Sequence, residues 1–511
     1  MPGFSFGCWI SEFDRSFRST RLWEFDMAYR IQRIELFIRE TLPGRMAFSL
    51  GKQGSVDVQE GLVSPLGHVR MIVSESDGNE TFGCAADRLS VRWLDKRPGR
   101  SLDLKRRELV WLIEQAREIY LAAGEFESPF ELWQKCHPKI MKLGRDANQE
   151  SLTSSFASAL FERAVVDAVC RLQDLPVFLA VKMGRIGFKP AAIHPEVAKL
   201  DWEKSLPRYP RAEFSIRHTV GGLDPISKDD LPADKRVNDG LPETLEEYIQ
   251  EDGIRFFKVK VSGNVDADLA RMAKVWSVVS RALEPVITLD ANEAYEDLGA
   301  FAEFVRRFEA EQTGCFQHVE YIEQPLPRAL TLDPKTTKQI RAISESKRLL
   351  IDEADGNVDA FRRTLDIGYL GTSHKNCKGF FKSLANHALM IHRSLDGHDT
   401  FLSGEDLQNL PIVPLQQDFA TLGILGLEHC ERNGHHYNFG LQLLSEKDKA
   451  RAVKRHPDLY VKRGDEWFLN IVDGAVECHS IHGPGFGIQD EPDWPSMMPM
   501  SQWVKLRHPA A

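Results

Sequence analysis

Apolar segments alternate with amphipathic helical segments through the middle of the chain. The five clearest strand and helix pairs are 256–263 with 266–282, 285–295 with 298–311, 319–327 with 334–346, 348–355 with 358–368, and 369–379 with 380–395. Short apolar runs separated by segments of helical period predict βα units in a parallel sheet. Three further segments, 213–222, 399–407 and 425–434, have the pattern of a first, a seventh and an eighth strand.

The spacing of these units favours a closed barrel. Eight βα units in about 250 residues give roughly 31 residues per unit, and the strand ends here follow one another at similar intervals. We therefore expect an α/β fold with a (β/α)8 barrel of the TIM type. A doubly wound open sheet is the second choice, since it has the same alternation but does not easily hold eight units in succession. Residues 27–150 mix strand-like and long helical segments, which is typical of an α+β domain.

Composition narrows the class of protein. Of the 511 residues, 42% are hydrophobic and 27% are charged, and no apolar run is long enough to cross a membrane. The net charge of −10 disfavours nucleic acid as a partner, because phosphate binding needs a concentrated basic face. The eight cysteines show no paired spacing and the N-terminus lacks the apolar core of a secretory signal, so we expect a cytoplasmic protein without disulfides.

Three predicted barrel strands end in an acidic residue. Asp290, Glu323 and Asp352 each follow an apolar run, and the carboxyl ends of barrel strands open on the one face where active sites lie. Each acid alone could be a helix N-cap. Three convergent carboxylates repel one another, so a bound cation is the better explanation, and an all-oxygen site suits Mg²⁺, with Mn²⁺ as the alternative.

Lysines flank these acids. Lys258 and Lys260 lie on one face of the strand before the first acid, and Lys375 ends the strand after the third. A nearby cation and a second ammonium group lower the pKa of a lysine, so one of these amines is expected to act as a base near neutral pH. Two lysines on opposite sides of a metal-bound substrate carboxylate could remove and return a proton on the carbon next to that carboxylate.

These motifs carry a family resemblance. The set "KVK" (258–260), "LDANEAY" (289–295), "YIEQPLP" (321–327), "IDEAD" (351–355) and "HKNCKG" (374–379) resembles the enolase superfamily, in its mandelate racemase and muconate-lactonizing branch. The segments 152–177 and 483–490 also resemble that branch, so the likeness covers roughly residues 27–495. Lysine or histidine bases working beside Mg²⁺ are a known feature of this superfamily.

The resemblance implies a role for each matching position. Asp290, Glu323 and Asp352 would bind Mg²⁺, Lys260 would be the base on one face, and Lys258 would assist it. Lys375 would act on the other face, with Lys378 as a competitor, because the family has two glycines after this lysine and this chain does not.

Neighbouring polar residues complete the predicted site. Asn292 and Glu353 adjoin metal ligands and are expected to orient them, while Glu405 is a candidate either for orienting a metal ligand or for substrate contact. The last loop also carries His429, His435 and His436, which could reach the substrate but are more simply explained as solvated loop residues.

We therefore expect a Mg²⁺-dependent enzyme that removes the proton α to the carboxylate of a small carboxylic acid through a metal-stabilised enediolate. Its outcome would be that of a cycloisomerase, epimerase or synthase. The alternatives are an acid-sugar dehydratase of the same superfamily and, in another class, a non-catalytic metal-binding or scaffold barrel. Residues 1–150 would form an α+β capping domain with an extra segment at 1–26, residues 151–440 the barrel, and residues 441–511 the rest of the cap. Association into a homo-oligomer stays open.

Overall fold

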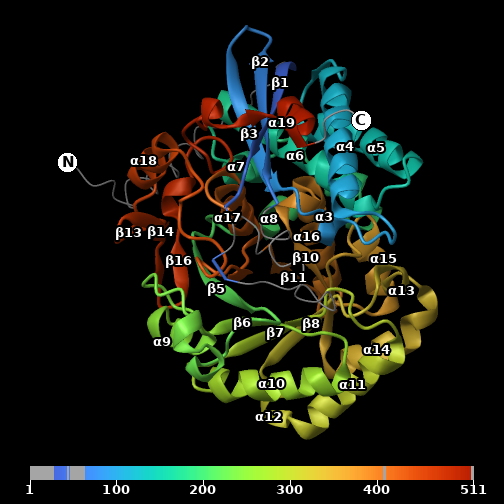
Figure 1. The fold of residues 1–511 in the computed structure, drawn as a ribbon. Coiled ribbons are helices and arrows are strands. Elements are labelled where there is room, and N and C mark those ends of the chain that lie inside the picture. Colours follow the sequence, from blue (N-terminus) through green and yellow to red (C-terminus); the bar gives the residue numbers. More distant parts are fainter. Residues whose placement is uncertain (1–27, 43–44, 47–63, 407–409, 508–511) are drawn as a thin grey trace.

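A computed structural model describes residues 28–42, 45–46, 64–406 and 410–507. The segment expected as an N-terminal extension, 1–26, lies outside the described residues. The described chain forms a barrel, at the bottom of Figure 1, and an antiparallel sheet with its helices, at the top.

Eight parallel strands close into the expected barrel. They are β5 (Glu213–Val220), β6 (Phe256–Lys260), β7 (Val286–Asp290), β8 (Val319–Glu323), β9 (Arg348–Ile351), β10 (Gly371–His374), β11 (Phe401–Gly404) and β12 (His429–Glu431). Each strand pairs with the next along the chain, and β12 pairs in parallel with β5, with Cys430 opposite Ile216. This closure confirms the (β/α)8 prediction and excludes the open sheet.

Helices follow the strands and cover the outside of the barrel. They are α9 (Leu245–Glu251), α10 (Val265–Val279), α11 (Leu298–Glu311), α12 (Thr313–Gln317), α13 (Arg328–Thr331), α14 (Thr337–Ser346), α15 (Ala360–Ile367), α16 (Phe380–Leu395) and α17 (Val413–Leu425). Their apolar faces pack against the strands in one continuous core, which agrees with the amphipathic pattern seen in the sequence.

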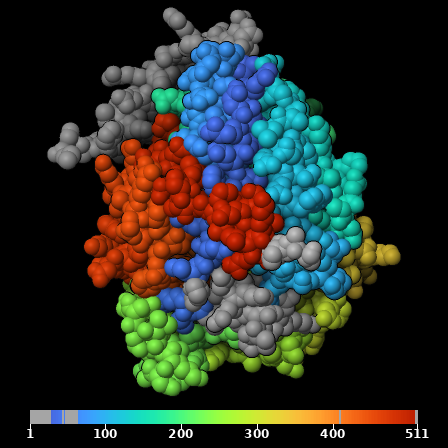
Figure 2. All heavy atoms as spheres, turned by 45° about the horizontal axis from the view of Figure 1, so that its top comes forward, coloured from blue at the N-terminus to red at the C-terminus, as the bar shows by residue number. Residues whose placement is uncertain are grey.

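The upper sheet is built from distant parts of the chain. Its strands are β1 (Tyr29–Arg39), β2 (Leu66–Glu75), β3 (Glu80–Arg88), the short β4 (Glu125–Phe126) and the C-terminal β17 (Met498–Pro499). Its helices are α3 (Val91–Leu94), α4 (Leu102–Leu121), α5 (Pro129–Asp146) and α19 (Met500–Arg507). Because β17 pairs with β1, the end of the chain lies on the sheet that its beginning forms, and Figure 2 shows the red C-terminal segment against the blue strands.

Helix α6 (Ser151–Leu172) connects the two parts. Along most of its length its side chains are buried, with Leu160 and Val165 in the core of the upper sheet and Val166 in the core of the barrel. Gly83 of β3 permits this close contact, because a Cβ atom there would lie 2.0 Å from the carbonyl oxygen of Ala164. The helix therefore fixes the upper sheet on the barrel.

The remaining C-terminal elements fill the side of the molecule between sheet and barrel. They are α18 (Glu446–Arg455), the hairpin of β13 (Tyr460–Arg463) and β14 (Glu466–Leu469), and the hairpin of β15 (Ile471–Val472) and β16 (Ala475–Glu477). Strand β16 pairs antiparallel with the first part of β5.

Candidate active site

The acids and lysines predicted from the sequence meet at the carboxyl ends of five neighbouring barrel strands. Lys260, Asp290 and Glu323 stand opposite one another in the registers of β6, β7 and β8, so they lie at one level of the barrel. Asp352 directly follows β9, and Lys375 directly follows β10. All five side chains are buried.

The acids are not helix caps. The side chain of Asp297 caps the helix after β7, and the N-cap positions after β8 and β9 are Pro327 and Asp359. The alternative explanation of Asp290, Glu323 and Asp352 as N-caps therefore fails, and their convergence needs another reason.

Lys258 occupies the centre of the cluster. Its ammonium nitrogen lies 2.7 Å from an oxygen of Glu323 and 2.7 Å from one of Glu405, 3.0 Å from Asp290 and 3.2 Å from Glu431. With 1% of its surface exposed, it is a buried cation surrounded by four acids.

Lys260 lies on the side of the cluster nearest to β7. It donates hydrogen bonds to Asp290 and, at 2.9 Å, to the amide oxygen of Asn292. Asn292 in turn donates to Glu353 at 3.0 Å, and its own backbone N–H donates to Asp290 at 2.9 Å. Asn292 and Glu353 thus lie where the sequence predicted, next to the acids that they were expected to orient.

Both candidate lysines after β10 reach Asp352. Lys375 contacts one carboxylate oxygen at 2.8 Å and Lys378 the other at 2.7 Å. Lys378 also donates to the backbone oxygen of Asp352 at 2.7 Å and to Ser373 at 2.6 Å, so its donors are used within the protein. Lys375 has fewer such partners and a slightly larger exposed fraction, 7% against 1%.

Glu405 is fixed inside the barrel. Its carboxylate accepts hydrogen bonds from Ser403 at 2.6 Å and from Tyr321 at 3.1 Å, and it forms a fully buried ion pair with Arg217. Because its other oxygen accepts a hydrogen bond from the ammonium of Lys258, Glu405 holds that lysine in place.

Glu431 is the acid that the sequence analysis missed. It ends β12, accepts a hydrogen bond from the Thr219 hydroxyl at 2.6 Å, and faces the ammonium of Lys258. The sequence carries a signal for it, because Glu431 ends a barrel strand as Asp290 and Glu323 do.

Those histidines have structural partners and are not solvated loop residues. His429 stacks on Phe256 and contacts Arg217, and His435 accepts a hydrogen bond from the backbone N–H of Leu469. His436 packs in a buried group of rings. Within the described residues, these contacts join all three to residues other than the acids and lysines of the cluster.

The comparisons with known proteins bear on the fold of the chain. A family model described as "Enolase C-terminal domain-like" matches residues 240–396. No curated protein matches the chain in sequence. The resemblance to the enolase superfamily is confirmed.

Several solved structures share the fold of this chain. A muconate lactonizing enzyme from Pseudomonas fluorescens, complexed with muconolactone, is 15% identical with a TM-score of 0.53, over 90% of this chain and 97% of that one. An enolase from Bradyrhizobium, complexed with magnesium and mandelic acid, is 15% identical with a TM-score of 0.55, over 92% and 97%. A 2-chloromuconate cycloisomerase from Rhodococcus opacus is 16% identical with a TM-score of 0.53, over 91% and 97%.

The pKa values of two lysines in the cluster are shifted in the opposite direction to the one expected from the sequence. Burial lowers the pKa of Lys258, but the carboxylates around it outweigh burial and hold that pKa well above its ordinary value. Burial likewise lowers the pKa of Lys375, but Asp352 and the other acids nearby outweigh burial, so this pKa is also above its ordinary value. The lowered pKa expected for the lysines is therefore wrong for these two, because the sequence did not reveal how many acids surround them.

The acids of the cluster differ in the direction in which their pKa values are shifted. Burial raises the pKa of Asp352, but Lys375 and Lys378 hold it well below its usual range. Burial, Asp290 and Glu405 raise the pKa of Glu323 well above its usual value, although the ammonium of Lys258 lies 2.7 Å from one of its carboxylate oxygens. Burial and Asp352 raise the pKa of Glu353 to about 7.

This donor set suits Mg²⁺ in its chemistry. Asp290, Glu323 and Asp352 offer only carboxylate oxygens, which Mg²⁺ prefers, and Oε1 of the buried Glu323 has no hydrogen-bond partner. In the described parts of the chain, however, no group of three His, Cys, Asp or Glu side chains has the spacing to enclose a metal ion. The ammonium of Lys258 lies between Asp290 and Glu323, so it has to leave that position for a metal to be enclosed.

The upper sheet contributes one side chain to the cluster, which the sequence analysis did not single out. The indole N–H of Trp93, in α3, donates to Asp352 at 3.3 Å, and the ammonium of Lys375 lies 4.2 Å from the centre of its ring. Arg328, after β8, donates to the backbone oxygen of Leu94 at 3.4 Å. These contacts place the segment after β3 over one edge of the barrel mouth.

Among the helices of the described residues, none is long and apolar enough to cross a membrane.

Proposed function

We propose that the protein is a Mg²⁺-dependent enzyme that removes the proton α to the carboxylate of a small carboxylic acid. The observation that supports it best is the order of charges around the barrel mouth. Lys260 and Lys375 pair with the two outer acids, Asp290 and Asp352, and Glu323, whose Oε1 has no hydrogen-bond partner, lies between these acids. Amines on two sides of a carboxylate set are what proton removal and return require.

Asp290, Glu323 and Asp352 would hold the ion, with Mn²⁺ as a substitute. Bound Mg²⁺ would supply positive charge to the substrate carboxylate as negative charge develops there. Two solved relatives of this fold, from Bradyrhizobium and Pseudomonas fluorescens, were determined with magnesium, which supports this choice of ion.

The chain's own residues would move the proton. Lys260 would accept the α-proton on its ε-nitrogen, and the electron pair left behind would spread onto the carboxylate oxygens. Lys375, whose raised pKa keeps it protonated beside Asp352, suits the role of proton donor or fixed cation on the opposite side. Lys258 would contribute a permanent positive charge next to Lys260, and Lys378 would hold Asp352 in place.

The lysine pattern favours a cycloisomerase, epimerase or synthase over an acid-sugar dehydratase. The muconate lactonizing enzyme and the chloromuconate cycloisomerase with this fold support the same choice, although at 15% and 16% identity they carry no substrate to this chain. Residues 151–440 would form the catalytic domain, capped by 1–150 together with 441–511. A cap residue, Trp93, already reaches Asp352, which supports a role of the cap at the barrel mouth.

Proton exchange in D₂O tests the proposal. The protein with Mg²⁺ is incubated with acid sugars, dipeptides, amino-acid derivatives and muconates, and mass spectrometry reads deuterium gain or product. We expect exchange at the α-carbon of one class, lost in Lys260→Ala and Asp290→Asn. Lys274→Ala is the matched control, because Lys274 is half exposed on α10 and pairs with Asp230, which is not part of the cluster.

Two outcomes would count against the proposal. Exchange that survives Lys260→Ala would remove Lys260 as the base. Mg²⁺ binding without exchange of any compound, and with no change on replacing Lys260, would favour the non-catalytic metal-binding barrel.

A further inference from the structure

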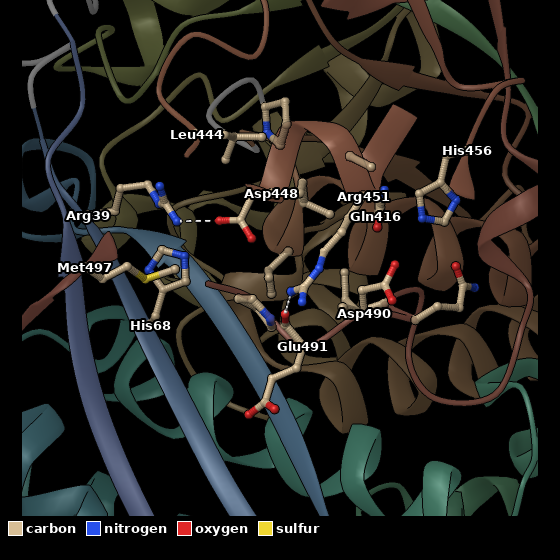
Figure 3. Close-up of a pocket in the computed structure, with 17 residues that line it drawn as sticks. Arg39, His68, Gln416, Leu444, Asp448, Arg451, His456, Asp490, Glu491 and Met497 are labelled. Carbon is tan, nitrogen blue, oxygen red and sulfur yellow. Dashed lines mark hydrogen bonds and ion pairs between the residues drawn. The ribbon is translucent and has the colours of Figure 1, made fainter. Parts of the chain in front are cut away.

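A second cavity lies away from the acid and lysine cluster. It encloses about 490 Å³, counting the part that opens to solvent, between the upper sheet and the C-terminal elements (Figure 3). Arg39 and His68 reach it from β1 and β2, Gln416 from α17, and Arg451 from α18. In Figure 3 the residues of the two strands face those of the two helices across the space.

The carboxylates that line this cavity are already neutralised. Each forms an ion pair with an arginine: Asp448 with Arg39 at 2.8 Å, Asp490 with Arg455 at 3.0 Å, and Glu491 with Arg70 at 2.6 Å. Among the described residues that line it, the cavity therefore has no unpaired acid to attract a metal cation.

Arg451 leaves an excess of positive charge there. Its guanidinium donates to the backbone oxygen of Glu491 at 2.7 Å, and none of the ion pairs found in the described residues includes it. A carbonyl oxygen carries no net charge, so the charge of Arg451 is not compensated. His68 and His456 add none, because burial lowers their pKa values to about 3 and about 4.

Three buried polar atoms of the lining lack hydrogen-bond partners. They are Nε of Arg39, Nδ1 of His68 and Oε1 of Gln416, on side chains with at most 6% of their surface exposed. Leaving such groups unpaired is costly, and native proteins seldom do so without a ligand or water. The guanidinium of Arg39 is a donor, whereas the Gln416 oxygen is an acceptor, so a ligand that satisfies both must accept and donate.

We propose that this cavity binds a small oxyanion that also carries a hydroxyl group, such as a 2-hydroxycarboxylate or hydrogen phosphate. The anionic oxygens would accept from Arg451 and from Nε of Arg39, and the hydroxyl would donate to Oε1 of Gln416. The site is independent of the proposed chemistry at the barrel mouth, and it bridges strands β1 and β2 to helix α18.

Calorimetric titration of the full chain without added metal tests this site. The probes are glycolate, inorganic phosphate, and acetate, which lacks the hydroxyl. We expect glycolate or phosphate to bind more tightly than acetate, and Arg451→Ala to weaken that binding about tenfold or more, as loss of a charge-assisted hydrogen bond does. Tighter binding of glycolate would indicate that the ligand is a 2-hydroxycarboxylate, and tighter binding of phosphate would indicate hydrogen phosphate.

Matched variants separate this site from the barrel mouth. Lys454→Ala removes an exposed charge from the same helix outside the cavity and should bind as the parent does. Lys260→Ala alters only the barrel mouth and should also leave this binding unchanged. Gln416→Leu should remove the preference for glycolate over acetate while thermal melting verifies the fold. Equal binding by the parent and Arg451→Ala, or no binding of either oxyanion, would overturn the proposal.

Discussion

The ammonium nitrogen of Lys258 lies 2.7 Å from Glu323, which ends β8, and 2.7 Å from Glu405, which follows β11. A buried charge that loses its partner costs about 3 to 5 kcal/mol. We therefore expect Lys258→Met to lower the free energy of unfolding by an amount of this size in the absence of metal, because several carboxylates lose their cation at once.

Added Mg²⁺ should restore part of that loss. A divalent ion can replace the missing charge among the same acids, so Lys258→Met should gain more stability from Mg²⁺ than the parent protein does. Urea unfolding with and without Mg²⁺ measures both changes. Lys382→Met is the control, since Lys382 is similarly buried but pairs with Asp355, which is not one of the predicted metal ligands. An equal gain in all three proteins would show that Lys258 does not compete for the metal position.

Trp93 and Lys375 should be energetically coupled. A cation over an indole ring in a desolvated setting contributes about 1 to 2 kcal/mol, and Lys375 lies 4.2 Å from this ring. A double-mutant cycle of Trp93→Leu and Lys375→Met, measured by urea unfolding, should give a coupling energy of that order. The same cycle with Trp111→Leu, a partly exposed residue of α4, should give none. Additive effects in both cycles would mean that the cap does not act on Lys375.

Much of the fold was predictable because parallel barrel strands carry a local signal. Two apolar runs lead to Asp290 and Asp352, and a helical segment follows each acid. Each run forms a strand, which ends at Asp290 in β7 and directly before Asp352 in β9. Period-two geometry also placed Lys258 and Lys260 on the same face correctly. Once the barrel is predicted, its geometry alone places these strand ends on one face.

Contacts between distant segments were not predictable in the same way. Trp93 lies in a four-residue helix, α3, and nothing local shows that it reaches Asp352, 259 residues later. The raised pKa of Lys258 depends on acids from four other strands, including Glu431, whose convergence only the closed barrel defines. The second cavity likewise joins β1 to α18, two elements separated by most of the chain.

Gly263 should be essential for placing Lys260. It has a φ of +80°, and a Cβ atom would lie 2.2 Å from the backbone oxygen of Ala294, in the loop that carries Asn292. Gly263→Ala should therefore cost about 3 kcal/mol or more, from the left-handed backbone and the clash together. Gly99→Ala, with a φ of +71° and no atom within 4 Å, should cost only about 1 kcal/mol. Thermal or urea unfolding compares them, and equal costs would contradict the argument.

Buried histidines should make the protein sensitive to acid. Burial lowers the pKa values of His68, His137, His218 and His435 to about 3. In the unfolded chain a histidine has a pKa of about 6.5, so below that pH the unfolded state binds protons that the native state refuses. The stability contributed by each neutral histidine is complete above about pH 6.5, and it falls as the pH drops toward 3 by about 1 kcal/mol per pH unit.

A single substitution isolates one of these contributions. Nδ1 of His137 lies 2.9 Å from the Ser158 hydroxyl, and an asparagine amide can make the same bond without titrating. His137→Asn should therefore flatten the dependence of unfolding free energy on pH, between about 6 and 4, by about 1 kcal/mol per unit. Urea unfolding at fixed pH values measures the slope, with His398→Asn in an exposed loop as the control. Parallel curves for His137→Asn and the parent would show that His137 takes up its proton in the folded protein as readily as in the unfolded chain.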